Sequence, residues 1–298
     1  MAELGFHVIG LDVVSEKVEL LNSGEVPFYE PELNEVLRRN IHAGRLTFTT
    51  SFAQAAEFAD IHFICVGTPQ QPGSYAADLS QVFGSVESLA PYLSPTDLVV
   101  GKSTVPVGTA DQIAAMLKIS VPGVEVAWNP EFLREGFAVQ DTLTPDRLVI
   151  GVRSPEAEAK LREVYAPMIE KEIPFLVTDF PTAELVKVAA NSFLATKISF
   201  INAMAEVCEA AGADVVQLAE AIGYDTRIGN RFLAAGLGFG GGCLPKDIRA
   251  FMARAGELGA EEALTFLREV DQINLRRRSH TVDLARKELG GQLRDKTI

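Results

Sequence analysis

The sequence predicts an α/β domain built on a parallel sheet, followed by an all-helical domain. From the N-terminus to about Val177, short β-branched segments alternate with helical segments, and this alternation is typical of a parallel sheet with helices on both faces. From Pro181 the segments become long and helical, without a strand pattern. We therefore expect the sheet domain over residues 1–180 and the helical domain over residues 181–290.

Each expected element rests on its residue pattern. Strands are expected where β-branched and aromatic residues cluster between turn residues, at 7–13, 46–50, 61–67, 98–103, 124–129 and 147–152. Helices are expected where apolar residues recur at helical spacing, at 15–23, 31–44, 79–93, 182–214, 214–224, 245–256 and 261–291. A Gly-Ala-Asp stop at 212–214 and the pair Gly290 and Gly291 end the two long helices.

Composition excludes several classes of protein. A chain of 298 residues with 47% hydrophobic content is expected to fold as two domains. A net charge of -13 argues against nucleic-acid or anionic-membrane partners. No apolar run approaches the roughly 18 to 20 residues of a membrane span, and the N-terminus lacks the basic flank of a signal peptide. With three cysteines, a disulfide framework is not expected, and we expect a cytoplasmic protein.

The first expected strand ends at Asp12, where an acidic residue can accept hydrogen bonds from a cofactor ribose. An Asp at this place also suits a turn or a helix cap, with Ser15 as a second cap candidate. Lys17, farther on, suits either a phosphate contact or solvent. The G-x-G-x-x-G turn that precedes such an Asp in a Rossmann-like fold is not in the sequence. We therefore expect the strand and turn that carry it to lie before Met1.

Two later strands open into loops rich in small polar residues, "VGTP" at 66–69 and "KSTVPVGT" at 102–109. Such loops at the carboxyl edge of a sheet suit ligand contact, and they also suit plain turns.

Lys187 and Asn191 are four residues apart in an expected helix and so share one of its faces. Their neighbours, among them Val186 and Val188, are apolar, so the pair is expected to be partly buried and to need polar partners. Otherwise they form an exposed pair.

Glu131 and Glu135 have the same spacing in a segment that begins at Pro130. Two carboxylates on one helix face are typical of a solvated face, unless a cleft lies over them.

Cys243 follows a run of glycines at 238–242 and precedes the helix that Pro245 begins. The positive end of that helix favours a thiolate, Lys246 adds positive charge, and Asp247 could orient a lysine or a water. The pattern therefore leaves two interpretations, a nucleophile or a packed thiol. Cys65 and Cys208, in an expected apolar strand and an apolar helix, are expected to be inert.

Taken together, these segments resemble the UDP-glucose/GDP-mannose dehydrogenase family, and most of all its bacterial members that act on UDP-glucose. The resemblance rests on ordered motifs from the first residues to the last: "LNSGEVPFYEPEL", "VGTP", "KSTVPVGT", "NPEFLREG", "PDRLVIG", "AELVKVAANSFLATKISFINAMAEVCE", "RIGNRFL" and "GFGGGCLPKD". It implies an NAD-dependent enzyme without a metal that oxidises the C6 alcohol of a sugar nucleotide to a carboxylate.

The resemblance also implies roles for individual residues. Cys243 would capture the aldehyde, Lys187 and Asn191 would stabilise oxyanion charge, and the carboxylate of Asp247 would work with that lysine on a water. Glu131 would act as acid and base in thioester hydrolysis, with Thr104 positioning the water. These residue types suit the chemistry, because an alkoxide needs a cation and a donor, and hydrolysis needs a base.

Two binding sets are implied as well. NAD would contact Asp12, Lys17, Thr68, Thr104, Glu135 and Lys246. The sugar nucleotide would contact Phe132, Leu133, Arg134, Glu135, Lys187, Asn191, Phe232, Leu233, Gly236 and Gly240. Arg227 would reach the site of a second subunit in a homodimer formed through the helical domain.

The chain departs from the family pattern at both ends. The family begins with a strand and a glycine-rich turn, and it continues into a further nucleotide-binding domain of which residues 291–298 would be the first part. We therefore expect this chain to be weakly active or inactive.

Three alternatives stay open: oxidation of GDP-mannose, a one-step hydroxyacid dehydrogenase that needs no cysteine, and a non-catalytic dimerisation module. The "RRR" at 276–278 is expected to be a solvated helix face rather than a phosphate site.

Overall fold

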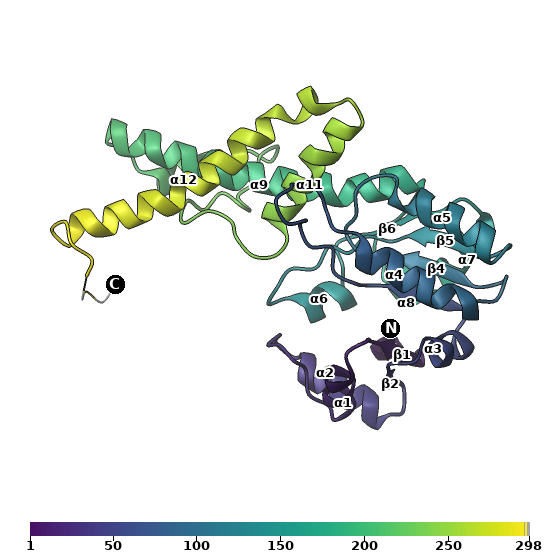
Figure 1. Ribbon diagram of the computed structural model, residues 1–298. Coiled ribbons are helices and arrows are strands. Elements are labelled where there is room, and N and C mark those ends of the chain that lie inside the picture. The colour runs from purple at the N-terminus through teal and green to yellow at the C-terminus, as the bar shows by residue number, and fades with distance from the viewer. Residues whose placement is uncertain (295, 297–298) are drawn as a thin grey trace. The chain divides into compact units, whose positions relative to one another are not determined.

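The structure is a computed structural model that describes residues 1–294 and 296. The chain divides into two compact units (Figure 1). Unit 1 comprises Met1–Thr68 and Asp78–Lys187, and unit 2 comprises Pro69–Ala77 and Val188–Ile298. The segment 291–298, expected to begin a further domain, falls partly outside the described residues.

The strands are β1 (Val8–Leu11), β2 (Leu46–Thr49), β3 (Ile61–Ile64), β4 (Leu98–Gly101), β5 (Glu125–Trp128), β6 (Leu148–Gly151) and β7 (Phe175–Thr178). The helices are α1 (Ser15–Asn22), α2 (Leu33–His42), α3 (Phe52–Phe58), α4 (Ser80–Leu89), α5 (Thr109–Ser120), α6 (Ala138–Leu143), α7 (Pro155–Val164), α8 (Ala166–Ile169), α9 (Phe180–Ala211), α10 (Val215–Gly223), α11 (Leu244–Glu257) and α12 (Thr265–Glu288). Three short 3-10 helices are η1 (Ala2–Leu4), η2 (Ala90–Tyr92) and η3 (Glu261–Leu264).

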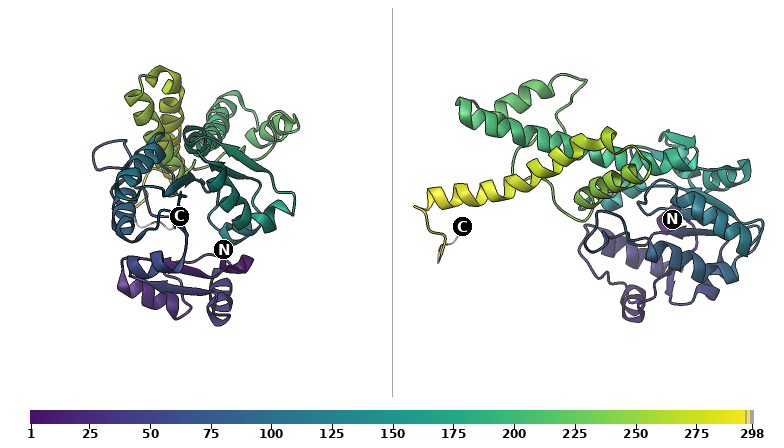
Figure 2. Two further views of the ribbon diagram at one scale, coloured as in Figure 1. Left: turned by 90° about the vertical axis from the view of Figure 1, so that its right-hand side faces the viewer. Right: turned by 45° about the horizontal axis from the view of Figure 1, so that its top comes forward.

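The strands of unit 1 form two sheets rather than one (Figure 2). β1 pairs with β2 in parallel, and the second sheet has the order β3-β4-β5-β6-β7. Its strands are parallel except that β5 and β6 meet antiparallel at the pair Trp128 and Gly151. All six expected strands are confirmed. β7 was not expected from the sequence, because this strand has only four residues and its two central residues are exposed.

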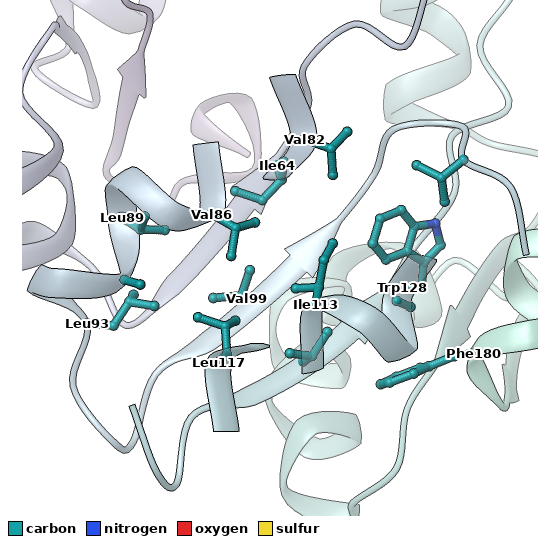
Figure 3. Packing of buried hydrophobic residues seen from close by; sticks show 14 of the residues in the cluster. Ile64, Val82, Val86, Leu89, Leu93, Val99, Ile113, Leu117, Trp128 and Phe180 are labelled. Carbon is teal, nitrogen blue, oxygen red and sulfur yellow. The ribbon is translucent and has the colours of Figure 1, made fainter. Parts of the chain in front are cut away.

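One face of the larger sheet carries the main apolar core of unit 1 (Figure 3). Helix α4 buries Val82 and Val86, and helix α5 buries Ile113 and Leu117, so each helix presents residues one turn apart to the sheet. They cover the strand residue Val99 together with Ile64, Leu89, Leu93, Trp128 and Phe180.

The opposite face of this sheet is covered by α7 and α8. Leu161 and Met168 from these helices pack on Leu98, Val100 and Ile150. Since β4 is thus buried on both faces, its sequence is a continuous apolar run rather than an alternating one.

Unit 2 is helical, as expected. Its core joins Ala195 of α9, Ile248 of α11 and Leu267 of α12. Figures 1 and 2 show α12 alongside α9, and the Ser199 hydroxyl donates a hydrogen bond of 2.7 Å to the Val270 carbonyl between them. The helix expected over 261–291 is divided, because residues 261–264 form a 3-10 turn before α12. Within the described part of the chain, no helix is both long and apolar enough to cross a membrane.

The close packing of β4 on β5 generates a stability prediction for Gly101. A Cβ atom on Gly101 would lie 2.1 Å from the ring of Trp128, which is fully buried and cannot move aside. We expect Gly101→Ala to lower the free energy of unfolding by about 1–3 kcal/mol, because overpacking a rigid core forces a backbone shift.

Gly84 is the matched control, since a Cβ there meets nothing within 4 Å in the middle of α4. Gly84→Ala should raise the free energy of unfolding by about 0.5–1 kcal/mol, because alanine favours a helix. Urea denaturation of the three proteins measures both effects, and equal stabilities would contradict the prediction.

Candidate active site

A buried ion pair in unit 1 joins helix α9 to the segment after β5. Lys187 lies on α9 and is only 4% exposed, and its Nζ is 3.0 Å from Oε1 of Glu131. The same ammonium lies 5.6 Å from the centre of the Phe132 ring. The expectation that a partly buried Lys187 needs a polar partner is confirmed, because a buried ammonium is costly unless paired.

The segment around Glu131 is irregular, so the expected helix face shared by Glu131 and Glu135 is wrong. The Glu131 carboxylate accepts a hydrogen bond of 2.6 Å from the Leu133 N–H, which curls the chain away from a helix. The Glu30 carboxylate accepts from the N–H groups of Gly136 and Ala138, at 3.0 and 2.7 Å, where α6 begins. Glu135 is exposed, while Glu131 is directed to Lys187.

The polar side chains of Asn129, Lys102 and Tyr165 form a hydrogen-bond network at the start of this segment. Asn129, just before Pro130, accepts hydrogen bonds from Lys102 at 3.1 Å and from Tyr165 at 2.5 Å. Its own amide donates to the Val149 carbonyl at 2.8 Å. Burial lowers the pKa of Lys102 and raises the pKa of Tyr165. This network was not expected from the sequence, although Lys102 and Asn129 each follow a buried strand.

Glu184 is a second buried charge on α9, one turn before Lys187. Its two carboxylate oxygens accept hydrogen bonds of 2.7 Å from the N–H groups of Gly108 and Ala110. These N–H groups belong to the N-terminus of α5, where a carboxylate is favoured by the helix dipole. Glu184 therefore fixes α9 against the loop that carries Thr104. Apolar neighbours around a Glu were the signal for it in the sequence.

Two of the residues expected to bind NAD are joined by a hydrogen bond. The Thr68 hydroxyl donates to the Thr104 carbonyl at 2.7 Å and so ties the loop after β3 to the loop after β4. Asp12 follows β1, where it ion-pairs with Lys17 and accepts from the Val14 N–H at 3.1 Å. Burial opposes ionisation of Asp12, but these two hydrogen bonds lower its pKa overall. A carboxylate at this strand end suits ribose hydroxyls.

Two arginines expected at the sugar-nucleotide site are exposed and already paired. Arg134 makes a two-point contact with Asp141, at 2.9 and 2.6 Å. In unit 2, Arg227 contacts Asp225 in the same way, with a closest distance of 2.6 Å. Phe232 is exposed and has a φ of 64°, whereas Leu233 is buried and Gly240 is exposed.

In unit 2, Cys243 caps the N-terminus of α11, with Pro245 in the first turn, as expected. Cys243 is exposed. Asp247, one turn on, is buried, and its carboxylate accepts from Lys246 and from the Asn191 amide, both at 2.6 Å. The structure therefore joins the Lys246 ammonium, the Asp247 carboxylate and the Asn191 amide by hydrogen bonds, one helical turn along α11 from Cys243.

The expectation that Cys65 lies inside a strand is wrong, because β3 ends at Ile64 and the residue is exposed. Desolvation of its thiol nevertheless raises the pKa of Cys65, which agrees with the expected inert thiol. Cys208 is buried. The expected solvated face at 276–278 is wrong for one residue. In the "RRR" segment, Arg277 is buried, since it lies on the face of α12 that carries Val270 and Asn274. Arg276 and Arg278 are exposed, which agrees with the expected solvated face.

Comparison with known families gives two matches that together cover most of the chain. Residues 1–169 match the NAD-binding domain of the UDP-glucose/GDP-mannose dehydrogenase family, and residues 181–276 match the central domain of the same family.

Curated relatives and solved structures agree with these matches. The UDP-glucose 6-dehydrogenase YwqF of Bacillus subtilis is 42% identical over 98% of the chain, and that of Rickettsia felis is 43% identical over the whole chain. The chain spans 66% of the length of each of these relatives. The structure of a UDP-glucose dehydrogenase from Pyrobaculum islandicum, 41% identical, aligns with a TM-score of 0.91 over 97% of this chain and 67% of its own. A GDP-mannose dehydrogenase from Pseudomonas aeruginosa, 30% identical, aligns with a TM-score of 0.72 over 96% and 67%.

The capping contact of Glu184 generates a second stability prediction. Glu184→Gln keeps the shape but gives one of the two α5 N–H groups an amide donor in place of an acceptor. We expect a loss of about 1–3 kcal/mol in the free energy of unfolding, because a buried N–H loses its partner. The half-buried Glu158, which pairs with Arg162 on α7, is the control, and Glu158→Gln should change the free energy of unfolding by less than about 0.5 kcal/mol. Denaturant titration measures both, and equal losses would contradict the capping role.

Proposed function

The chain belongs to the UDP-glucose/GDP-mannose dehydrogenase family, and on this premise we propose that it catalyses the NAD-dependent oxidation of the C6 alcohol of UDP-glucose to a carboxylate. The observation that carries the proposal is the exposed Cys243 at the N-terminus of α11, beside Lys246 and the buried Asp247. The N-terminus of a helix favours the thiolate, which is the nucleophilic form. Lys246 follows three residues later in the same turn, where its ammonium is paired with Asp247.

The reaction consists of two oxidations. The first removes a hydride and the hydroxyl proton from the C6 alcohol and gives an aldehyde. The Cys243 thiolate adds to the aldehyde carbon and forms a thiohemiacetal, whose oxidation by a second hydride transfer gives a thioester. Water then cleaves the thioester, which releases the carboxylate and restores the thiol. NAD, when bound, accepts the hydride, so two molecules of NAD are reduced for each sugar nucleotide oxidised.

Charged groups of this chain suit the intermediates. An oxyanion develops at C6 in the thiohemiacetal and again during thioester hydrolysis, and we assign its stabilisation to the ammonium of Lys187 and the amide of Asn191. Glu131, which is 3.0 Å from Lys187, is assigned as the acid and base of hydrolysis. Thr104 is assigned to position the water, and Asp247 to hold Asn191 and Lys246 in place.

Residues at the strand ends of unit 1 suit NAD, in keeping with the match to an NAD-binding domain. The carboxylate of Asp12 would accept hydrogen bonds from a ribose, with Lys17 beside it. Thr68, Thr104, Glu135 and Lys246 complete the proposed contacts with the cofactor.

The sugar nucleotide is proposed to be UDP-glucose rather than GDP-mannose, because the chain is 42% identical to the B. subtilis enzyme but 30% identical to the GDP-mannose dehydrogenase. Its proposed contacts are Phe132, Leu133, Arg134, Glu135, Lys187, Asn191, Phe232, Leu233, Gly236 and Gly240. The cysteines in the described part of the chain form no disulfide with one another, and we propose the reducing cytoplasm as the place of action.

A homodimer is proposed to form through α9. Phe193, Phe200 and Val207 are spaced by seven residues on this helix, and all three are exposed, Phe193 by 67%. A stripe of apolar side chains at this spacing is typical of a helix that packs against another helix. Arg227 would then serve the site of the second subunit.

The proposed reaction is tested by the stoichiometry of turnover. At the weak activity expected from the sequence, we propose that the protein still forms two NADH for each UDP-glucuronate, and we expect Cys243→Ser to lower the steady-state rate by at least about 10²-fold, because the nucleophile is lost. Cys65→Ser, which removes the other exposed thiol, is the control and should keep the rate. NADH absorbance and chromatography of the product measure both quantities.

Three outcomes would contradict the proposal: one NADH per product, an unchanged rate in Cys243→Ser, or no turnover by a protein whose melting temperature rises with NAD and UDP-glucose. Turnover with GDP-mannose but not with UDP-glucose would mean that GDP-mannose is the substrate.

The proposed dimer is tested by Phe200→Glu, which places a charge in the middle of the apolar stripe on α9. We expect the mass measured by light scattering to fall from that of a dimer to that of a monomer, because a carboxylate cannot be buried there without a partner. Tyr92→Glu changes an aromatic residue of similar exposure in unit 1 and should leave the mass unchanged. A monomeric unaltered protein, or a dimeric Phe200→Glu variant, would contradict the interface.

A further inference from the structure

The glycine-rich segment before Cys243 is held along its backbone by three buried polar side chains of unit 2. We call Asn202, Asn274 and Arg277 the loop clamp. Asn202 of α9 accepts a hydrogen bond of 2.9 Å from the Gly236 N–H, and Arg277 of α12 donates to the Gly236 carbonyl at 3.2 Å. All three side chains are less than about a tenth exposed. The hydrogen bonds that these buried side chains do make fix the backbone path, because a shift of the chain would leave the Asn202 carbonyl and the Gly236 backbone groups without their partners.

Asn274 makes the most specific of these contacts. Its Oδ1 accepts from the Phe239 N–H at 2.7 Å, while its Nδ2 donates to the Phe239 carbonyl at 2.9 Å. The amide thus pairs with both polar groups of one residue, as a neighbouring strand would. The Phe239 ring is buried in the core cluster with Ile248 of α11. Phe239 is therefore fixed by its backbone and by its side chain.

Gly238 shows how closely the backbone approaches Asn274. A Cβ on Gly238 would lie 2.2 Å from Asn274 Oδ1, and the φ of 92° at this position is one that favours glycine. Only a glycine here lets the chain pass over the amide and place Phe239 in register with it.

Between Phe239 and Cys243 the glycines pack against few neighbouring atoms. A Cβ at Gly240 or Gly242 would meet nothing within 4 Å, and Gly240, Gly241 and Gly242 are exposed. The path of this stretch is therefore determined by its two ends, the clamp on one side and α11 on the other. Loss of the clamp would free the glycines and let the first turn of α11 fray.

We propose that Asn274 is a positioning residue for Cys243: by pairing with the backbone of Phe239 it holds the thiol at the N-terminus of α11. The inference rests on the proposed function, in which that thiol is the nucleophile. Asn274 itself takes no part in bond making. Its effect on reactivity comes from keeping Cys243 where the N–H groups of the helix favour a thiolate.

The test is the pH dependence of Cys243 alkylation by iodoacetamide, measured by mass spectrometry of its peptide in the full chain without NAD or sugar nucleotide. In Asn274→Ala we expect the midpoint of the rate profile to rise by about 0.5–1 pH unit toward that of an ordinary thiol, and the rate at neutral pH to fall about three- to tenfold. Alkylation of Cys65, measured in the same samples, should not change.

Two further variants keep the test decisive. Gln272→Ala removes an exposed amide from the same helix and should leave the Cys243 profile as it is. Asn274→Ser keeps a hydroxyl that can face the Phe239 N–H, and should give an intermediate midpoint even where the alanine variant does not fold. Gly238→Ala should raise the midpoint like Asn274→Ala, and the double variant should shift it by less than the sum, because both changes act on one contact.

An unchanged midpoint in folded Asn274 variants, or an equal change in Cys65, would overturn the inference. The alkylation profile does not depend on turnover. A shifted profile in a protein that forms no NADH would therefore retain the positioning role while contradicting the proposed reaction.

Discussion

The burial of polar groups along α9 is the constraint on which the site depends. Glu184, Lys187 and Asn191 occupy successive turns of this helix and are all buried, so each needs a partner of fixed geometry. Glu184 takes the N–H groups of α5, Lys187 takes Glu131, and Asn191 takes Asp247. A single helix thereby fixes an acid, a cation and an amide by contacts that would be costly to leave unmade.

The clamp in unit 2 follows the same logic with backbone groups as the partners. Glycines before Cys243 permit the close approach of chain to side chain, but they also give the segment its conformational freedom. Asn274 and Arg277 restrict that freedom from α12, where burial makes their hydrogen bonds strong. The flexibility needed for a tight path and the rigidity needed for a fixed thiol are thus supplied by different residues.

Much of this could be predicted from the sequence, because buried strands and capped helices leave local patterns. The six strand patterns and the place of Cys243 at the start of α11 are local features, and they are confirmed. Cys65, Arg277 and the segment around Glu131 could not be predicted, because their environment is decided by distant partners: the end of β3, the packing of α12, and the hydrogen bonds of Glu30. Tertiary contacts override local pattern at these positions.

Ion pairing also shows how an acidic chain, of net charge -13, could accept the anionic sugar nucleotide that we propose as its substrate. Arg134 and Arg227 are 54% and 88% exposed in their pairs with aspartates, so solvent screens these pairs and each arginine can exchange its aspartate for a phosphate. The pair of Lys187 is only 5% exposed on the lysine side, and separating it would leave a charge unpaired in a buried place. Exposed cations are therefore suited to binding and exchange, whereas the buried Lys187 is suited to a charge that would develop during the proposed reaction.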